Sequence, residues 1–408
     1  MRCLLLLPGL LLVLPGCDPK VAEDTGTGDS ADSGVDTADS DTSTDSGDDS
    51  GEDSGEDSGD DTGDDTSAPP PHWQLVVATT DYTTGALATI DEDGTVHDSL
   101  IPISADAAIV ADRDTVYVLN RSSENTVVVY EHGDFTTPTA EFSTGDGSNP
   151  TGITRCGANL FVSRYLYGDI GVYDAVTGLA VGSVDLSAFD DGDGSAEPDS
   201  IYTAPNGSVY VSLNQIDYGG SYNSVDGSGT LVQLDCDNMT VLASWDVGPN
   251  PHFEFDPGNP AMLYLNGGNY FNADYSGPEL DGGVYTFDTN TNTLVGPHLT
   301  EAAVSYNIGS VVSSGLRRGF TTLDNASVWT PACLNLDTWA YLAVDAGNVY
   351  IGSHVATPDG TVWAAQGRGY GSGAPGAVGI VPYDTATCVA GTGLRTALPP
   401  ASLAVRVW

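Results

Sequence analysis

One phrase of sequence recurs along most of the chain and limits the folds that the chain can adopt. In its clearest form it reads PDSIYTAPNGSVYVS, from Pro198 to Ser212. Two stretches of alternating apolar and polar residues flank Asn206-Gly207, a dipeptide that supplies the positive φ angles of a tight hairpin turn. The phrase therefore predicts an antiparallel β-hairpin. Similar hairpins are predicted from Ala105, Pro150, Pro251 and Gly352.

The spacing of these hairpins predicts the architecture. Successive first strands begin about 45–55 residues apart, which is the length of a four-stranded propeller blade. The sequence therefore predicts an all-β fold, a β-propeller of seven four-stranded antiparallel blades, whose pattern is weakest between Tyr306 and Ile351. The seven predicted starts are Ala105, Pro150, Pro198, Pro251, Tyr306, Gly352 and Pro400.

The two ends of this region are expected to complete one blade. Residues Trp73 to Ser104 supply three strands without a first strand, and Pro400 to Val407 supply a first strand with nothing after it. Pairing of these segments would remove free sheet edges and close the ring. The third strand of several repeats also ends in an acidic turn, where the aspartate side chain is expected to bond the backbone two residues on.

The repeated pattern resembles a known family. A proline, an alternating strand, a glycine turn and VYV, with YD-x-x-T after the third strand, are similar to the YVTN-type (YncE-like) seven-bladed propellers. That family includes many bacterial surface lipoproteins and surface-layer-like proteins. The resemblance covers about Trp73 to Trp408 and departs from the pattern after Tyr306. It implies a binding or scaffold protein and carries no catalytic residue over to this chain.

An export signal is predicted at the N-terminus, in residues 1–16. Arg2 precedes an almost unbroken apolar run from Leu4 to Leu14, which is too short to span a membrane as a permanent helix. The run ends in LPGC (14–17), which resembles the lipobox of bacterial lipoproteins, where the cysteine is acylated. We therefore expect lipidation of Cys17 and an exported protein anchored at the outer membrane, the cell surface or the periplasm. A plain signal peptide is the alternative.

A highly acidic linker (17–71) follows the predicted signal. From residue 21 onward it consists almost entirely of Asp, Ser, Thr, Gly and Glu, and it has no aromatic residue. Such a composition cannot bury enough apolar surface to offset the entropy of ordering. We expect a disordered stalk with the propeller at 72–408. A solvated spacer is its expected role, and diffuse calcium binding is the alternative.

The net charge limits the partners. The chain carries a formal charge of −46, and the predicted propeller contains nine arginines and no lysine. So acidic a surface is not expected to bind nucleic acid or an anionic lipid face. We therefore expect a monomer whose membrane contact is the lipid at Cys17 and whose ligand is a protein, peptide or polysaccharide.

Four cysteines lie in the predicted propeller, and their spacing resembles no metal motif. An exported protein meets an oxidising compartment, so disulfides are expected. Four cysteines allow three pairings, and the sequence does not choose among them. We favour the pairing of sequence neighbours, Cys156 with Cys236 and Cys333 with Cys388, because each would link adjacent blades.

Several loops between predicted second and third strands are rich in tyrosine, asparagine, glycine and arginine, which is the composition of a recognition surface. Arginine forks suit carboxylate or sulfate groups, so an anionic ligand is one interpretation. The alternatives are that arginine neutralises nearby aspartates and that tyrosine fills gaps between blades. The expected ligand-binding residues on these loops are Arg121, Arg164, Tyr165, Tyr218, Tyr222, Tyr270, Arg368 and Tyr370.

The segment FDDGDGSAEPDS, from Phe189 to Ser200, indicates a cation site. Asp191, Asp193 and Glu197 offer carboxylate oxygens at short spacing, with glycine for a sharp turn, and a hard cation takes such ligands. Calcium is therefore a candidate cofactor, and no other cofactor is indicated. The spacing is not that of an EF-hand, and an acidic turn capped by its own side chains is the alternative.

Asp199 and His252 are predicted at the inner ends of neighbouring blades, where their side chains can reach the central funnel and a ligand. A lone histidine there is more often hydrogen-bonded structure than a catalytic base. The sequence has no HExxH, no GxSxG and no phosphate-binding loop followed by lysine. We therefore expect a binding or scaffold module rather than an enzyme. A lactonase-like hydrolase or lyase and a structural surface-layer protein are the alternatives.

Overall fold

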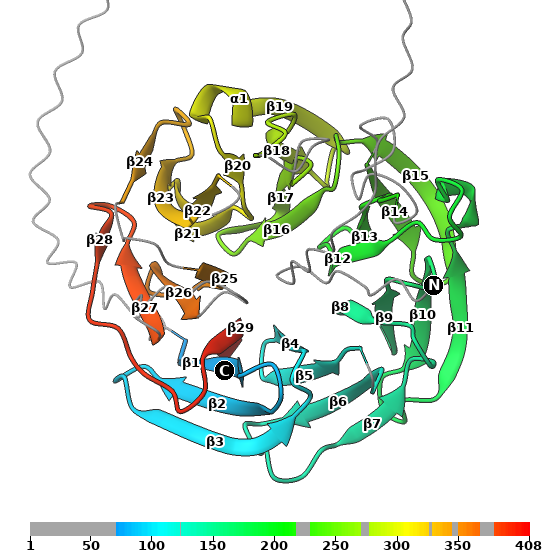
Figure 1. Ribbon diagram of the computed structural model, residues 1–408. Coiled ribbons are helices and arrows are strands. Elements are labelled where there is room, and N and C mark those ends of the chain that lie inside the picture. The colour runs from blue at the N-terminus through cyan, green and yellow to red at the C-terminus, as the bar shows by residue number, and fades with distance from the viewer. Residues whose placement is uncertain are drawn as a thin grey trace, which may run out of the picture. The chain divides into compact units, whose positions relative to one another are not determined.

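The structure is a computed structural model, and it describes residues 71–122, 124–217, 229–270, 277–325, 329–344, 350–367 and 379–408. The predicted signal segment, the lipidation site Cys17 and the linker up to residue 70 lie outside the described residues. The described residues form seven antiparallel β-sheets arranged in a ring (Figure 1). The prediction of a seven-bladed propeller is therefore confirmed. Among the described residues, no helix has the length and apolarity needed to cross a lipid bilayer.

Blades 1 to 4 each contain four strands, which follow one another from the channel outward. Blade 1 contains β29 (Pro400–Val407), β1 (Trp73–Thr80), β2 (Gly85–Asp91) and β3 (Val96–Ile103). Blade 2 contains β4 (Ala107–Asp112), β5 (Thr115–Asn120), β6 (Thr126–Glu131) and β7 (Ala140–Ser143). Blade 3 contains β8 (Pro150–Cys156), β9 (Asn159–Arg164), β10 (Asp169–Asp174) and β11 (Ala180–Asp185). Blade 4 contains β12 (Pro198–Thr203), β13 (Ser208–Leu213), β14 (Thr230–Asp235) and β15 (Thr240–Asp246).

Blades 5 to 7 follow the same order. Blade 5 contains β16 (His252–Asp256), β17 (Asn259–Gly267), β18 (Gly283–Asp288) and β19 (Thr293–Thr300). Blade 6 contains β20 (Asn307–Ile308), β21 (Val312–Gly315), β22 (Arg318–Asp324), β23 (Trp329–Asn335) and β24 (Tyr341–Ala343). Blade 7 contains β25 (Tyr350–Ala356), β26 (Thr361–Gly367), β27 (Gly379–Asp384) and β28 (Val389–Ala390). A 3₁₀ helix, η1 (Ser187–Phe189), precedes β12, and a short helix, α1 (Glu301–Val304), precedes β20.

Blade 6 departs from the four-strand rule, as the weak sequence pattern after Tyr306 indicates. Its inner edge is split into β20 and β21, which both pair with β22. Between them the backbone at Gly309 approaches β22 so closely that a Cβ atom there would lie 2.3 Å from the Thr322 hydroxyl. The Thr321 hydroxyl donates to the Gly309 carbonyl at 2.8 Å. The inner strand is therefore interrupted by a side-chain-stabilised break rather than absent.

The hydrophobic core is distributed between the blades. Among the described residues, seven clusters of buried apolar side chains each join two neighbouring blades. The second strand of a blade therefore has buried residues on both faces, as in β13, where every residue from Val209 to Leu213 is buried. Outer strands such as β11 show little alternation between buried and exposed residues, and most of their residues are exposed. The second strand is therefore more continuously buried than the alternation in the hairpin phrase predicts, because neighbouring blades pack on both of its faces.

The chain ends close the ring as the sequence predicts. Strand β29 pairs antiparallel with β1, from Trp73 opposite Val407 to Thr79 opposite Pro400. Leu403 and Ala404 of β29 are buried in the neighbouring inter-blade clusters. Strands from the two ends of the propeller therefore make one sheet without a free inner edge.

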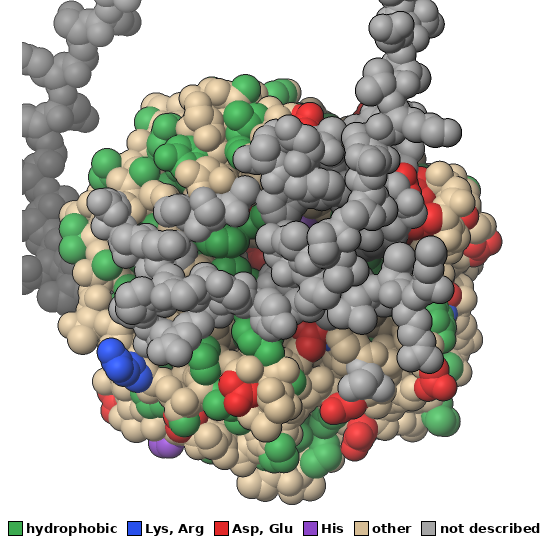
Figure 2. All heavy atoms as spheres, viewed as in Figure 1, with side chains coloured by type: hydrophobic (Ala, Val, Ile, Leu, Met, Phe, Trp, Pro, Cys, Tyr) green, Lys and Arg blue, Asp and Glu red, His purple; other side chains and the backbone are tan. Residues whose placement is uncertain are grey.

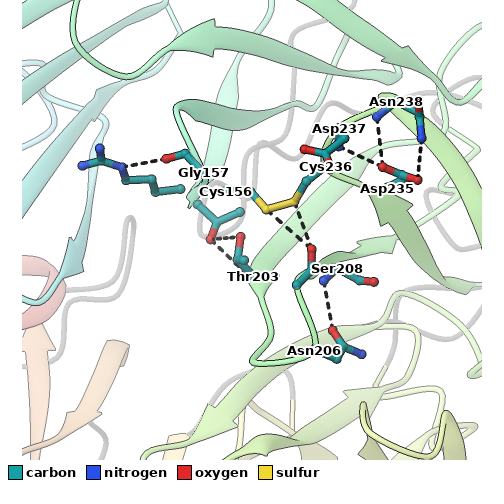
Figure 3. Close-up of a disulfide and its surroundings, with 12 residues drawn as sticks. Cys156, Gly157, Thr203, Asn206, Ser208, Asp235, Cys236, Asp237 and Asn238 are labelled. Carbon is teal, nitrogen blue, oxygen red and sulfur yellow. Dashed lines mark hydrogen bonds between the residues drawn. A yellow bond between two sulfur atoms is a disulfide. The ribbon is translucent and has the colours of Figure 1, made fainter.

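Both favoured disulfides are present. Cys156, at the end of β8, is bonded to Cys236, which follows β14, with Cα atoms 6.1 Å apart (Figure 3). Cys333, in β23, is bonded to Cys388, which follows β27, with Cα atoms 5.7 Å apart. The first disulfide links blades 3 and 4, and the second links blades 6 and 7. Each bond therefore joins adjacent blades, as the favoured pairing requires.

The acidic turns after the third strands have the predicted local role. The Asp235 carboxylate accepts the backbone N–H groups of Asp237 and Asn238 at 2.8 and 2.9 Å (Figure 3). Asp174 and Asp384 accept backbone N–H groups two residues on in the same way. Blade 6 uses Asn335 at this position, and the neighbouring Asp337 is paired with Arg317 instead. The Thr177 hydroxyl and then the backbone bonds lower the pKa of Asp174, and backbone bonds are the main cause of the lowered pKa values of Asp235 and Asp384.

Candidate functional site

The loops between second and third strands leave the ring on the same side as the connections from one blade to the next, because strand direction alternates within each sheet. We call this side the loop face. The described part of the surface in Figure 2 carries many more acidic than basic side chains, as the composition implies. Tyr218, Tyr222, Arg368 and Tyr370, four of the predicted ligand-binding residues, lie outside the described residues.

A cavity of about 220 Å³ opens on the loop face beside the channel, at the first residues of β29, β4 and β25. We call it the funnel-mouth cavity. Tyr82, from the loop between β1 and β2, and Tyr350, the first residue of β25, contribute aromatic rings to its wall. Tyr82 is 44% exposed. Polar lining comes from Asp106, Arg121, Ser353 and Ser402.

Arg121, predicted as a ligand-binding residue, lines this cavity but is already paired. Its Nη2 donates to Asp106 Oδ1 at 2.7 Å, and its Nε donates to the Asp106 carbonyl at 3.1 Å. The Ser122 hydroxyl donates to the other carboxylate oxygen of Asp106 at 2.7 Å. The guanidinium therefore forms part of the cavity wall and neutralises Asp106. It does not offer Nε and Nη2 as a pair of donors to a ligand.

Tyr350 lies within electrostatic reach of Tyr270, a tyrosine outside the cavity wall. Burial, Tyr82 and Asp324 raise the pKa of Tyr350 to about 12, against an opposing effect of Arg121. Burial and the charge of Asp324 also raise the pKa of Tyr270. The ring of Tyr350 packs edge-on against Trp329 at 4.9 Å. The phenol groups at this cavity and beside it are therefore neutral and stay protonated at physiological pH.

Arg164, the second described arginine of the predicted set, is also paired. It makes a two-point ion pair with Asp169, in which Nε lies 2.7 Å from Oδ1 and Nη2 contacts Oδ2. Its Nη1 donates to the Thr144 carbonyl at 3.2 Å, and the guanidinium lies 4.9 Å from the centre of the Tyr167 ring. Burial opposes the charge on Arg164, but Asp169 outweighs burial and raises the pKa of Arg164. The neighbouring Tyr165 is buried.

Asp199 and His252 are brought together, as their predicted positions require. Asp199 Oδ2 lies 2.5 Å from His252 Nδ1, which links the inner strands of blades 4 and 5. Burial opposes the charge on His252, but Asp199 outweighs it, so the pKa of His252 is raised. Glu254 stands two residues further along β16 and therefore projects from the same face. The side chain of Glu254 is exposed, but desolvation by the surrounding protein and the charge of Asp199 raise its pKa to about 7, with His252 acting in the opposite direction.

A second inner-strand histidine shows the ordinary structural role. His354 in β25 donates from Nε2 to the Ser310 carbonyl at 2.8 Å and packs against Phe320. Burial lowers the pKa of His354 to about 4, so this ring is neutral. His252, in contrast, retains a titratable ring beside two carboxyl groups. Of these two histidines, His252 is the one that can move a proton near neutral pH.

The predicted cation-binding residues lie in the connection between β11 and β12, on the loop face. Single carboxylate oxygens of Asp190, Asp191 and Asp193 lie within 4.8 Å of one another. Glu197 is completely buried, and its Oε2 accepts the Ile216 N–H at 3.0 Å. Burial and the charge of Asp193 raise the pKa of Glu197 to about 8. The sequence pattern indicated three of these carboxylates and missed Asp190.

Other residues of the loop face were also missed. Tyr82 occupies a loop between a second and a third strand, because β29 is the first strand of blade 1. Ligand-binding residues were predicted in loops between second and third strands, and the same criterion in the shared blade would have found Tyr82. Tyr350 and Asp106 directly begin or precede inner strands, so position in the repeat was again the available signal. Glu254 could also have been found from the sequence, because it lies two residues after His252 in a predicted strand and such residues project from the same face.

Comparison with known structures supports the fold. A protein from Bacteroides fragilis proposed to be a 6-phosphogluconolactonase is 16% identical, with a TM-score of 0.53, over 84% of this chain and 99% of that one. A protein from Lactobacillus plantarum is 12% identical, with a TM-score of 0.54, over 83% and 99%. Hydrazine synthase from Kuenenia stuttgartiensis is 15% identical, with a TM-score of 0.53, over 74% and 91%. No family model and no curated protein matches the sequence. At these identities the likeness concerns the propeller fold alone.

Proposed function

We propose that this protein is an exported, lipid-anchored propeller that binds a protein or polymer ligand through its loop face. The lipobox-like LPGC at 14–17 and the acidic linker after it support the anchor at Cys17. The resemblance to YVTN-type propellers supports the same placement at a bacterial envelope. Like charges extend a flexible tether, so we expect the acidic composition of the linker to keep the propeller away from the lipid.

The funnel-mouth cavity is the observation that carries the binding role. It is concave, it lies on the loop face, and it combines two tyrosine rings with hydroxyl groups and a fixed arginine. Phenol rings offer large contact area at low entropic cost, and their hydroxyls adapt to polar ligands. The described arginines Arg121 and Arg164 are both paired with aspartates. We therefore infer that the ligand is neutral or positively charged rather than a polyanion.

The anchor is tested by the variant Cys17→Ser in the producing cell. Acylation requires the thiol of Cys17, so the variant should incorporate no labelled fatty acid while the parent chain does. Equal labelling of the two proteins would contradict the anchor without bearing on the binding face.

The binding face is tested by photo-crosslinking. The photoreactive residue p-benzoylphenylalanine replaces Tyr82 at the funnel-mouth cavity in one variant and Tyr341 on the outer strand β24 in another. These tyrosines are equally accessible, at 44% and 41% exposed. We expect a ligand adduct at position 82 and none at position 341 after illumination of producing cells. Adducts at both positions in equal amount, or none at position 82, would contradict a loop-face ligand and favour a structural spacer.

A hydrolase or lyase is the second candidate, and the Asp199–His252–Glu254 group favours it. A histidine oriented by one carboxylate and placed beside a second carboxyl group can transfer protons at neutral pH. The test is hydrolysis of simple lactones by the parent protein and by His252→Asn. Turnover that is lost in the variant would support this candidate, and equal rates in both proteins would rule out a role of His252.

A further inference from the structure

We propose that the connection between β11 and β12 is a binding site for one calcium ion. The protein ligands are carboxylate oxygens of four residues, Asp190, Asp191, Asp193 and Glu197. The site lies on the loop face, at the joint between blades 3 and 4. It is independent of the ligand proposed for the funnel-mouth cavity.

The spacing of the three aspartates fits one hard cation. Their carboxylate oxygens lie within 4.8 Å of one another. Calcium binds oxygen ligands at about 2.3–2.6 Å, so two oxygens on one ion are at most about 5 Å apart. The side chains of Asp190, Asp191 and Asp193 are therefore already close enough to share an ion.

A buried carboxylate without a complete set of partners lies in the same connection as these aspartates. Glu197 has no exposed surface, and its Oε2 is used by the Ile216 N–H. Its Oε1 is buried and has no hydrogen-bond partner among the described residues. Oδ2 of Asp191 is in the same state. Ionising a buried carboxyl group that lacks a donor is costly, which is why the pKa of Glu197 is raised, and a bound cation would remove that cost.

No basic side chain replaces the cation. None of the ion pairs among the described residues includes any of the four proposed ligands. Arg164, in the adjacent loop, is paired with Asp169. Burial and the charge of Asp193 raise the pKa values of both Asp191 and Glu197, which places these carboxyl groups within electrostatic reach of one another.

The turn bonds in this loop are compatible with metal binding. Asp190 Oδ1 accepts the N–H groups of Gly192 and Gly194 at 2.8 and 2.9 Å. Asp193 Oδ1 accepts the Ser195 N–H at 3.0 Å. Each cap uses one oxygen and leaves the other for an ion. The capped turn and the calcium site are therefore two properties of one loop.

The ion would also hold a recognition loop in place. The Ser195 hydroxyl donates to the Tyr165 carbonyl at 2.8 Å. Gly168 packs so closely on the calcium loop that a Cβ atom there would lie 2.8 Å from Ser195 Cα. The segment 163–169, which carries Arg164, therefore rests directly on the proposed site.

The test compares the parent chain with Glu197→Gln, in full-length protein washed with a chelator and then supplied with calcium chloride. Glutamine keeps an acceptor for the Ile216 N–H and removes the charge. At a calcium concentration one hundred times the dissociation constant, the ratio of folded to unfolded parent protein should rise about a hundredfold. The matched control Asp237→Asn changes an exposed aspartate in the turn after β14 and should respond like the parent.

The direction in which the melting temperature changes distinguishes a metal ligand from a carboxylate with a purely structural role. In chelator, Glu197→Gln should melt at or above the temperature of the parent, because a neutral amide in this buried position needs no counter-charge. In calcium it should melt below the parent. A lower melting temperature in both solutions, or an undiminished calcium shift in the variant, would overturn the proposal.

A local readout excludes calcium bound by the acidic linker. Hydrogen exchange of peptides that cover 186–197 should slow on calcium addition in the parent and in Asp237→Asn, and remain unchanged in Glu197→Gln. Unchanged exchange of these peptides in the parent would overturn the site. Equal protection by magnesium at the same concentration would overturn the assignment to calcium, because magnesium demands a stricter octahedral geometry.

Discussion

Two buried glutamates lead into blades 4 and 6 and differ in how their oxygens are used. Glu197 precedes β12 and is 0% exposed, and Glu301 begins α1 before β20 and is 1% exposed. Both oxygens of Glu301 accept backbone N–H groups, from Gly282 and Ile308, each at 2.9 Å. Only one oxygen of Glu197 is hydrogen-bonded, and the charges of Asp193 and Asp191, in the same connection, raise its pKa further.

This difference separates a structural carboxylate from a ligand. Glu301 fills the space against the backbone so fully that a Cβ atom on Gly268 would lie 2.5 Å from its oxygens. Burial raises the pKa values of both glutamates, to about 7 for Glu301 and about 8 for Glu197. Burial and a raised pKa therefore do not identify a binding site by themselves. The unfilled oxygen and its acidic neighbours do.

The largest expected change in stability concerns the disulfide that links blades 3 and 4. It lies on the side of the ring opposite Glu197, between the same two blades. Replacing Cys156 and Cys236 by alanine opens a cross-link over a sequence separation of 80 residues. The free energy of unfolding should fall by about 4 kcal/mol, since the unfolded chain regains that freedom. Urea denaturation with and without calcium measures it. The calcium-dependent gain should survive, because distant sites are additive.

The matched control for that experiment is the pair Cys333 and Cys388, which links blades 6 and 7 across 55 residues. Its replacement by alanine should cost a similar amount. Loss of the calcium response only in the first variant would show that the metal loop depends on the disulfide at the other end of its joint.

The next prediction concerns Glu301, the carboxylate with a structural role. Glu301→Ala should lower the free energy of unfolding by about 3 kcal/mol, because two backbone N–H groups lose their buried acceptor. The loss should be identical in calcium and in chelator. A calcium-dependent loss at Glu301 would break the distinction drawn between the two glutamates.

A smaller effect should follow pH. Glu301 has a folded pKa of about 7 against 4.5 in the unfolded chain, so the folded state holds the extra proton. The resulting stability is fully present below pH 4.5 and is lost as pH rises through 7. In chelator, we expect the contribution of Glu301 to the free energy of unfolding to fall by about 2 kcal/mol over this range. The pKa difference sets an upper limit of about 1.4 kcal/mol per unit, and relaxation of the surroundings keeps the change below that limit.

Glu301→Gln provides the control for that pH series. Urea unfolding between pH 4.5 and 7.5 should show a flatter profile for this variant than for the parent, even though general repulsion acts on both acidic chains. Parallel profiles would mean that Glu301 does not change its charge within this range.

The smallest effect concerns the exposed turns on the side opposite the loop face. Asp235→Ala removes the acceptor for the N–H groups of Asp237 and Asn238. Water can replace those bonds, so the melting temperature should fall only slightly and by the same amount with or without calcium. A calcium-dependent change here would mean that exposed aspartates contribute to the metal response as well.

The repeat in the sequence determined the fold. Predicted first strands lie within two residues of the observed ones, and the shared blade, both favoured disulfides and the capped acidic turns are present. These features depend on local spacing: alternation sets a strand, Asn-Gly sets a turn, and an aspartate bonds the backbone two residues on.

Only the tertiary structure decided how the charges and rings are used. Arg121 finds Asp106, Tyr270 meets Asp324, and the funnel-mouth cavity joins Tyr82 to Tyr350, because ring closure brings distant residues together. The sequence named Asp199 with His252 and three of the four proposed calcium ligands from their places in the repeat. It could not distinguish Glu197 from Glu301, since burial and the number of hydrogen-bond donors around each carboxylate are set by packing between blades.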